Sequence, residues 1–151
     1  MSTNPELYEQ DFYAWTQEQA TLLEARQFDA IDLPHLVEEI LSLGISDRRA
    51  LTHHLMRLVI HLLQWRYQPG EQSSGWRGSI RDARLQIHLV LEDSPSLSRQ
   101  VVALLQRYYP QARVWAQEDT GLPLGTFPEP CPWMPEQILD DDFWPEAEAM
   151  S

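Results

Sequence analysis

Apolar side chains at helical spacing are the feature that most constrains the fold of this chain. Between Leu36 and Trp65 they recur with a period of about 3.6 residues, and between Trp76 and Leu91 they recur at steps of three or four. Such spacing places the apolar residues on one face of an α-helix. The sequence therefore predicts an all-α protein, a small bundle of helices that bury a common core.

Residues that start and stop helices divide the chain into about four main helices. Asn4 followed by Pro5 predicts the start of a helix over 5–26, and Asp32 predicts the start of a second helix that ends at Pro69. A third helix is expected over 76–92. Ser94 followed by a proline repeats the first signal, and it predicts the start of a fourth helix that extends to about residue 120.

Two residues inside these predicted helices are expected to disturb them. Gly44 is followed by Ser46 and Asp47, which form a possible second cap, so a break or a kink is expected there. Pro110 lacks the backbone N–H that a helix interior needs, so the fourth helix is expected to kink or restart at that point.

The segment 121–151 combines prolines with large apolar side chains. Five prolines between Pro123 and Pro135 prevent long regular structure. The large side chains in this segment are those of Phe127, Trp133, Ile138, Leu139, Phe143 and Trp144. They are too apolar for a free linker, so we expect a tail packed on the bundle, with one helical turn after Pro135. The predicted organisation is one domain over 1–151, with a bundle over 5–120 and a docked tail over 121–151.

Composition excludes several classes of protein. Hydrophobic residues make up 43% of the chain, which is typical of a packed globular protein, and the longest apolar runs are too short to span a membrane. The single cysteine, Cys131, cannot form an intrachain disulfide, and the first residues have neither the basic nor the apolar segment of a secretory signal. A cytoplasmic location is therefore expected.

The charge balance argues against nucleic acid as a partner. The formal net charge is −12, and all 11 basic residues are arginine. Binding to nucleic acid depends on neutralising phosphates, which an acidic chain does poorly unless its basic groups cluster. Residues 117–151 contain no arginine and nine acidic residues, so the tail is the most acidic segment.

Arginine does cluster in one place, along the third predicted helix. Arg77, Arg81, Arg84 and His88 follow one another at steps of four, three and four, which makes a basic stripe beside the apolar one. The stripe is a candidate anion-binding surface. The alternative, which we favour, is that its guanidinium groups pair with Glu38, Glu39 or the acidic residues 140–142 of the tail.

The histidines do not form a metal motif. His54 and His61 lie seven residues apart, a rise of about 10.5 Å along a helix, so they cannot share one ion directly. His35 is suitably spaced from Glu38 and Glu39, but a solvated pair beside a first-turn histidine explains that pattern more simply. Neither a metal nor a cofactor is expected. Glycine loops for nucleotides, the GxSxG elbow and HExxH are all missing, and Cys131 has no histidine in its local sequence.

Several blocks of the sequence resemble one family. They are YEQDFYAWTQEQATLL, LPHLVEEILSLG, LVIHLLQWRYQP, GWRGSIRDARLQI, EDSPSL and FPEPCPW, and in this order they resemble the DUF29 family. The resemblance implies a bacterial protein, from a family frequent in cyanobacteria, with a helical bundle and no assigned reaction. Recurring positions of the pattern correspond to Glu38, Glu39, His61, Trp65, Pro69, Trp76 and Arg84. The sequence departs from the pattern at Leu41, where an acid is frequent, and at Gln64, where a lysine is frequent.

Family positions and helical phases together suggest one polar cluster. Its candidate members are Glu38, Glu39, His54 and His61 on the second predicted helix and Arg84 on the third. Such a set can perform acid–base chemistry or hold a small anion, but it can equally form a buried network that fixes helix register. We favour the network, and with it a noncatalytic protein that acts through contacts with partner proteins or with itself. A small-molecule or metal-dependent enzyme is the alternative.

Overall fold

A computed structural model describes residues 6–146, and within that range every regular element is helical. The predicted all-α class is therefore confirmed. The chain divides into two compact units, residues 1–46 (unit 1) and residues 47–151 (unit 2). The organisation as a single domain stays a prediction. Among the described helices, none is long and apolar enough to cross a membrane.

Unit 1 begins with two helices where one was predicted. Helix α1 spans Leu7–Gln10 and helix α2 spans Phe12–Glu24, so the expected continuous helix over 5–26 is wrong. Asp11 separates them, because its backbone leaves the helical region and its side chain accepts a hydrogen bond from the backbone N–H of Ala14 at 3.0 Å. The predicted cap at Asn4 and Pro5 lies outside the described residues.

Helix α2 is followed, after Ala25, by a residue in the left-handed conformation. Arg26 has φ = 59°, and the backbone N–H of Gln27 reaches back to the carbonyl of Leu22 at 2.9 Å. This is the geometry of a Schellman helix end, in which glycine usually takes the left-handed position. The chain then turns through residues 27–32 into the next helix.

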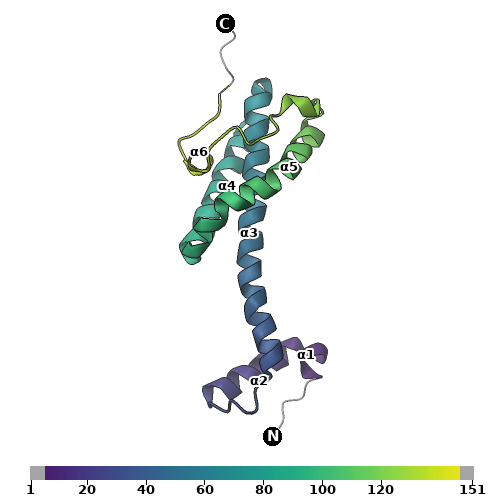
Figure 1. Cartoon of the computed structure of the whole chain (residues 1–151), viewed down its shortest axis with the longest axis vertical. Helices are drawn as coiled ribbons and strands as arrows, with labels where there is room; N and C mark the ends of the chain where they lie inside the picture. Colours follow the sequence, from purple (N-terminus) through teal and green to yellow (C-terminus); the bar gives the residue numbers. More distant parts are fainter. Residues whose placement is uncertain (1–5, 147–151) are drawn as a thin grey trace. The chain divides into compact units, whose positions relative to one another are not determined.

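Helix α3 spans Leu33–Tyr67 without interruption (Figure 1). A break or a kink was expected at Gly44, and the break does not occur, since the helical hydrogen bonding continues through that residue. A glycine inside a helix costs only about 1 kcal/mol relative to alanine, and this cost alone does not end a helix. The boundary between the two compact units nevertheless falls nearby, between Ser46 and Asp47.

Unit 2 contains the rest of α3, two long helices and the tail (Figure 1). Helix α4 spans Ser74–Asp93 and is capped by Ser73, whose hydroxyl accepts a hydrogen bond from the N–H of Trp76. Helix α5 spans Val101–Thr120. Short 3₁₀ turns join the helices at Pro69–Glu71 (η1), Pro95–Gln100 (η2) and Leu124–Thr126 (η3), so the fourth predicted helix begins with a 3₁₀ segment.

Pro110 lies inside α5, which neither stops nor restarts there. The helix continues because side chains on both sides of the proline, including Leu105, Tyr109 and Ala112, are buried on the same face. Packing of this kind compensates for the missing backbone hydrogen bond. The helix ends instead at Gly121, which has φ = 73° and whose N–H donates to the carbonyl of Gln117.

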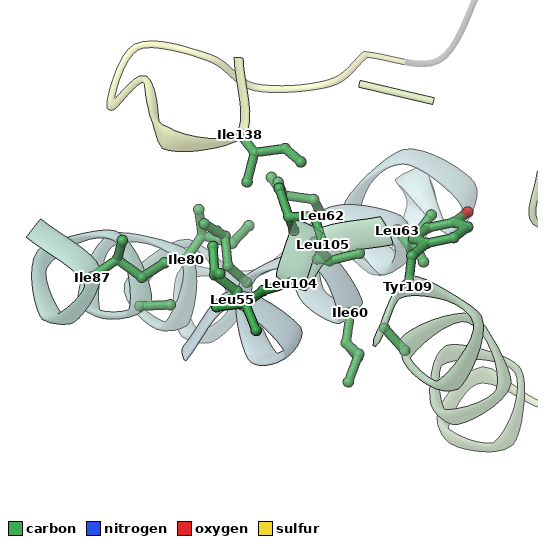
Figure 2. Packing of buried hydrophobic residues seen from close by; sticks show 14 of the residues in the cluster. Leu55, Ile60, Leu62, Leu63, Ile80, Ile87, Leu104, Leu105, Tyr109 and Ile138 are labelled. Carbon is green, nitrogen blue, oxygen red and sulfur yellow. The ribbon is translucent and has the colours of Figure 1, made fainter. Parts of the chain in front are cut away.

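The core of unit 2 includes the tail. Leu55, Leu62 and Leu63 of α3 meet Ile80 and Ile87 of α4 and Leu104 and Leu105 of α5 (Figure 2). Helix α6, Pro135–Leu139, is the predicted turn after Pro135, and its Ile138 points into this core with no exposed surface. Phe127 is 1% exposed. The predicted packing of the tail on the helices is therefore confirmed.

Candidate functional site

The members of the predicted polar cluster belong to different units. Glu38 and Glu39 lie in unit 1, whereas His54, His61 and Arg84 lie in unit 2. Glu39 has a hydrogen-bond partner within unit 1, and His61 and Arg84 have theirs within unit 2.

Arg84 is the most deeply buried charged side chain of unit 2, at 1% exposure. Its Nε donates to the carbonyl oxygen of Ile138 at 2.9 Å, and its Nη2 donates to that of Phe143 at 2.7 Å. Nη1 lies 3.5 Å from the carbonyl oxygen of Asp141. Burial lowers the pKa of the guanidinium, while Asp141 and Asp140 act in the opposite direction. The group still carries its charge at neutral pH, because arginine does not deprotonate in proteins.

The partners of Arg84 differ from those that the sequence suggested. Pairing with the carboxylates of residues 140–142 was expected, but the hydrogen bonds go to main-chain carbonyls of the same segment. Ile138 lies in α6, and the other two carbonyls follow its end, where carbonyl groups have no partner within the helix. A buried charge needs hydrogen bonds to offset its desolvation, and the tail supplies them. Arg84 therefore acts as the anchor of the tail.

Two other members of the basic stripe, Arg77 and His88, also contact the tail. The guanidinium of Arg77 lies 5.4 Å from the ring centre of Trp65 and 5.2 Å from that of Trp144, which are cation–π distances. His88 Nε2 is 3.2 Å from the carbonyl oxygen of Leu139 and 4.0 Å from a carboxylate oxygen of Asp141. Arg81 is exposed. The predicted anion-binding stripe thus has three of its four members in contact with residues 139–144 or with the carbonyl of Ile138.

The histidines of α3 have separate surroundings. His61 Nδ1 bonds the carbonyl oxygen of Arg57 one turn earlier, at 2.8 Å. Arg57 forms an ion pair with Asp82 of α4 at 2.6 Å. His54 Nδ1 is buried and has no hydrogen-bond partner among the described residues. Burial lowers the pKa of His54, as do His53 and Arg57, which indicates a neutral ring at pH 7.

In unit 1, Glu39 belongs to a network that the sequence did not reveal. The hydroxyl of Tyr8 donates to Glu39 Oε1, and this bond raises the pKa of Tyr8 to about 12. The ring of Tyr8 stacks on that of His35 with centroids 3.9 Å apart. These residues are far apart in sequence and carry no motif, so only the fold could bring them together.

Asp32 is the centre of the same network. It accepts hydrogen bonds from Trp15 Nε1 at 3.0 Å and from His35 Nδ1 at 2.7 Å, and its backbone N–H donates to Gln19 Oε1. Burial alone would raise the pKa of Asp32, but the hydrogen bonds outweigh it and the pKa is lowered. The hydrogen bond between Asp32 and His35 raises the pKa of His35. The residue predicted as a helix cap therefore also joins α2 to the start of α3.

A metal at His35 with Glu38 or Glu39 was considered from sequence and not expected. The ring nitrogen Nδ1 of His35 is occupied by Asp32, and Glu39 is bonded to Tyr8. Over residues 6–146, no group of three or more histidine, cysteine or carboxylate side chains is arranged to hold a metal ion.

An apolar groove of about 390 Å³ lies between α2 and the first turns of α3, entirely within unit 1. We call it the α2–α3 groove. Its lining residues are Phe12, Trp15, Thr16, Gln19, Ala20 and Leu23 of α2, and Leu36, Glu39, Ile40 and Leu43 of α3. The sequence signal that could have revealed it is the density of large apolar residues on a unit too small to bury them.

Gln19 is a buried polar member of this lining. It is 1% exposed, and its Nε2 has no hydrogen-bond partner among the described residues. Its other side-chain atom, Oε1, is held by the N–H of Asp32. The amide is thus held through its oxygen, while the two N–H donors of its NH₂ group have no acceptor among the described residues.

Replacing Arg84 tests the anchoring of the tail. Arg84→Met keeps an apolar stem but removes every donor, so the free energy of unfolding is expected to fall by about 3 kcal/mol or more, since hydrogen bonds to charged groups contribute about 1.5 to 3 kcal/mol each. Arg81→Met, on the exposed side of the same helix, is the matched control and should change it by less than about 0.5 kcal/mol. Urea unfolding measures both. Equal midpoints for the two variants would contradict the anchor.

The Asp32–His35 pair predicts a pH dependence in unit 1. Because the pKa of His35 is raised, it contributes stability that is fully present below pH 6.5 and is lost as the pH rises through the pKa of the folded state. Because the pKa of Asp32 is lowered, it contributes stability that is present above pH 3.8 and is lost as the pH falls through the pKa of the folded state. NMR titration should therefore give His35 a pKa above 6.5 and His54 one below it. Asp32→Asn should lower the pKa of His35; an unchanged value would refute the pair.

Comparison with known families places residues 7–144 within the family model described as domain of unknown function DUF29. The match covers nearly the whole of the described chain and agrees with the resemblance of the sequence blocks. Comparisons with curated proteins and with solved structures give no match.

Proposed function

Because the chain belongs to the DUF29 family, whose description assigns no activity, we propose from its own structure that it is a noncatalytic helical protein acting through contacts with other proteins. The supporting observation is the distribution of exposed apolar side chains. Of the sixteen large hydrophobic side chains that are exposed in the described chain, ten lie in unit 1. They are Phe12, Tyr13, Leu23, Phe28, Leu33, Val37, Ile40, Leu41, Leu43 and Ile45.

Unit 1 has few buried side chains. Trp15 is its only buried hydrophobic residue among those described, and Gln19 is the only other buried side chain. Full burial of a leucine or isoleucine side chain is worth about 1.5 to 3 kcal/mol, so this surface holds a large unused driving force for association. Exposed apolar side chains that are concentrated in one part of a folded protein indicate an interaction site. The polar residues predicted as a site add support, since Arg84, Glu39 and His61 are engaged in intramolecular hydrogen bonds.

We also propose a cytoplasmic location in a bacterium. Cys131 is a free thiol. A reducing compartment preserves such a thiol, whereas secreted domains commonly pair their cysteines. The family resemblance supports the bacterial origin.

One observation favours the alternative, a small-molecule or metal-dependent enzyme. Nδ1 of the neutral His54 ring has no partner among the described residues, and it is the kind of buried polar atom that a ligand can satisfy. Elemental analysis and native mass spectrometry of untagged protein distinguish the two. A stoichiometric metal or small molecule that is lost from His54→Ala or His61→Ala would favour the enzyme, whereas protein without a ligand would leave these histidines as part of the architecture.

Capture from a lysate of the native host tests the proposed function. The wild-type chain should retain a specific protein. The variant Ile40→Gln with Leu43→Gln changes the exposed face of α3 without changing the net charge, and it should retain that protein at least about tenfold less. The matched control changes two exposed leucines of α4 in unit 2, Leu85→Gln with Leu89→Gln, and should capture like the wild type. No specific partner, or equal capture by all three proteins, would count against the proposal.

A further inference from the structure

The α2–α3 groove has the form of a site for one additional helix. Along α2 the lining residues Phe12, Thr16, Gln19 and Leu23 recur at steps of three or four, and Leu36, Ile40 and Leu43 do the same along α3. Two helical stripes that face one groove are completed by a third amphipathic helix, as in helix-in-groove recognition. From Phe12 to Leu23 the stripe rises about 16 Å, which matches about three turns of an occupant.

The exposed fractions show that the groove is open at its rim. Leu43 is 70% exposed, Ile40 is 65% exposed and Phe12 is 49% exposed, whereas Trp15 at the base is 2% exposed. The base is therefore already packed and fixed by the hydrogen bond from Trp15 to Asp32, and the rim is the part that an occupant would cover. A preformed base lowers the ordering cost of binding.

The net charge of unit 1 selects the occupant. Residues 1–46 contain nine acidic residues and one arginine, whereas residues 47–151 contain fourteen acidic residues and ten arginines. The formal net charge is thus −8 for unit 1 and −4 for unit 2, so most of the net negative charge belongs to the smaller unit. An apolar groove in an acidic unit is complementary to a helix with one apolar face and lysine or arginine beside it. A second copy of unit 1 would carry the same negative charge and be repelled.

Gln19 adds a polar requirement. Gln19 lines the groove, and its Nε2 donor is buried and lacks a partner among the described residues. Buried donors in folded proteins nearly always find an acceptor. An acceptor on the occupant, such as a serine hydroxyl or an asparagine carbonyl on its apolar face, would satisfy it and fix the register of the bound helix.

We propose that the α2–α3 groove binds a basic amphipathic helix of a partner protein. This inference rests on the proposed function and names the chemistry of its partner. The occupant places apolar side chains at steps of three and four against Leu23, Ile40 and Leu43, and its basic residues face the acidic surface of unit 1.

The test uses the full chain and synthetic peptides of about 18 residues, a length at which isolated helices begin to form. The first peptide carries leucine along one helical face and lysine elsewhere. The second has the same leucines with glutamate in place of lysine, and the third has the composition of the first with the leucines out of helical phase. Isothermal titration calorimetry should show binding of the first peptide alone, weakened by added salt.

Variants locate the binding. Ile40→Gln with Leu43→Gln leaves the charge unchanged and should weaken binding of the leucine–lysine peptide about tenfold or more, while Leu85→Gln with Leu89→Gln should bind like the wild type. A further peptide replaces one leucine of the leucine–lysine peptide with asparagine. Gln19→Met keeps the volume of the side chain but removes its amide donor, so this variant should bind the asparagine peptide more weakly than the wild-type chain does. Equal binding of the out-of-phase peptide, or equal binding to the groove variant, would overturn the proposal by showing charge attraction alone.

Two further outcomes separate this inference from the proposed function. A dimer in sedimentation velocity that the groove substitutions dissociate would overturn the basic helix in favour of a second copy. If the peptide fails to bind but capture from the native lysate still depends on Ile40 and Leu43, the chemistry of the occupant is wrong and the proposed function stands. Capture that does not depend on these residues would overturn both.

Discussion

The guanidinium of Arg84 is the interaction on which the structure of unit 2 depends. It is buried between α4 and the tail, and it bonds main-chain carbonyls at and beyond the end of α6. An uncompensated charge at this depth would be strongly destabilising, so the charge and the tail require each other. With the segment in place, Ile138 closes the apolar core and Trp144 packs against Trp65 at 4.9 Å. The carbonyl groups at and beyond the end of α6 are thus all directed to one side chain.

Unit 1 satisfies its polar groups in a similar way but leaves its apolar groups exposed. Asp32 joins Trp15, His35 and Gln19, and Glu39 joins Tyr8, so hydrogen bonds hold α1, α2 and the start of α3 together. The apolar side chains around these bonds, such as Ile40 and Leu43, remain exposed. A unit as short as residues 1–46 buries too little surface for a large core of its own, and units of this size are commonly stabilised by association with another chain. The proposed function follows from this difference between the units.

Helical periodicity and turn residues predicted much of this fold from sequence. The all-α class, the limits of α4, the turn after Pro135 and the docked tail are properties of local spacing and of apolar content, which a sequence displays directly. The interruption at Asp11 was not predicted because a cap can interrupt an apolar pattern, and α3 and α5 continue through Gly44 and Pro110 because packing can outweigh the propensity of one residue. The partners of Arg84 and the Asp32 network could not be predicted, since they join distant segments and involve main-chain atoms without a sequence signature. The α2–α3 groove could not be predicted either, because helical spacing shows which side chains share a face but does not show whether another segment covers that face.

Hydrogen exchange resolved by residue tests the central claim, that unit 2 is a completed core and unit 1 an incomplete one. Amide groups of α5 and of α3 beyond Asp47 should exchange only through global unfolding, because they surround buried side chains such as Leu58 and Leu104. Amide groups of α2 should exchange through local opening at a clearly lower free energy, and Arg84→Met should not change that local value. Protection of α2 equal to that of α5 in the isolated protein would contradict the account, because it would mean that unit 1 needs no partner to complete it.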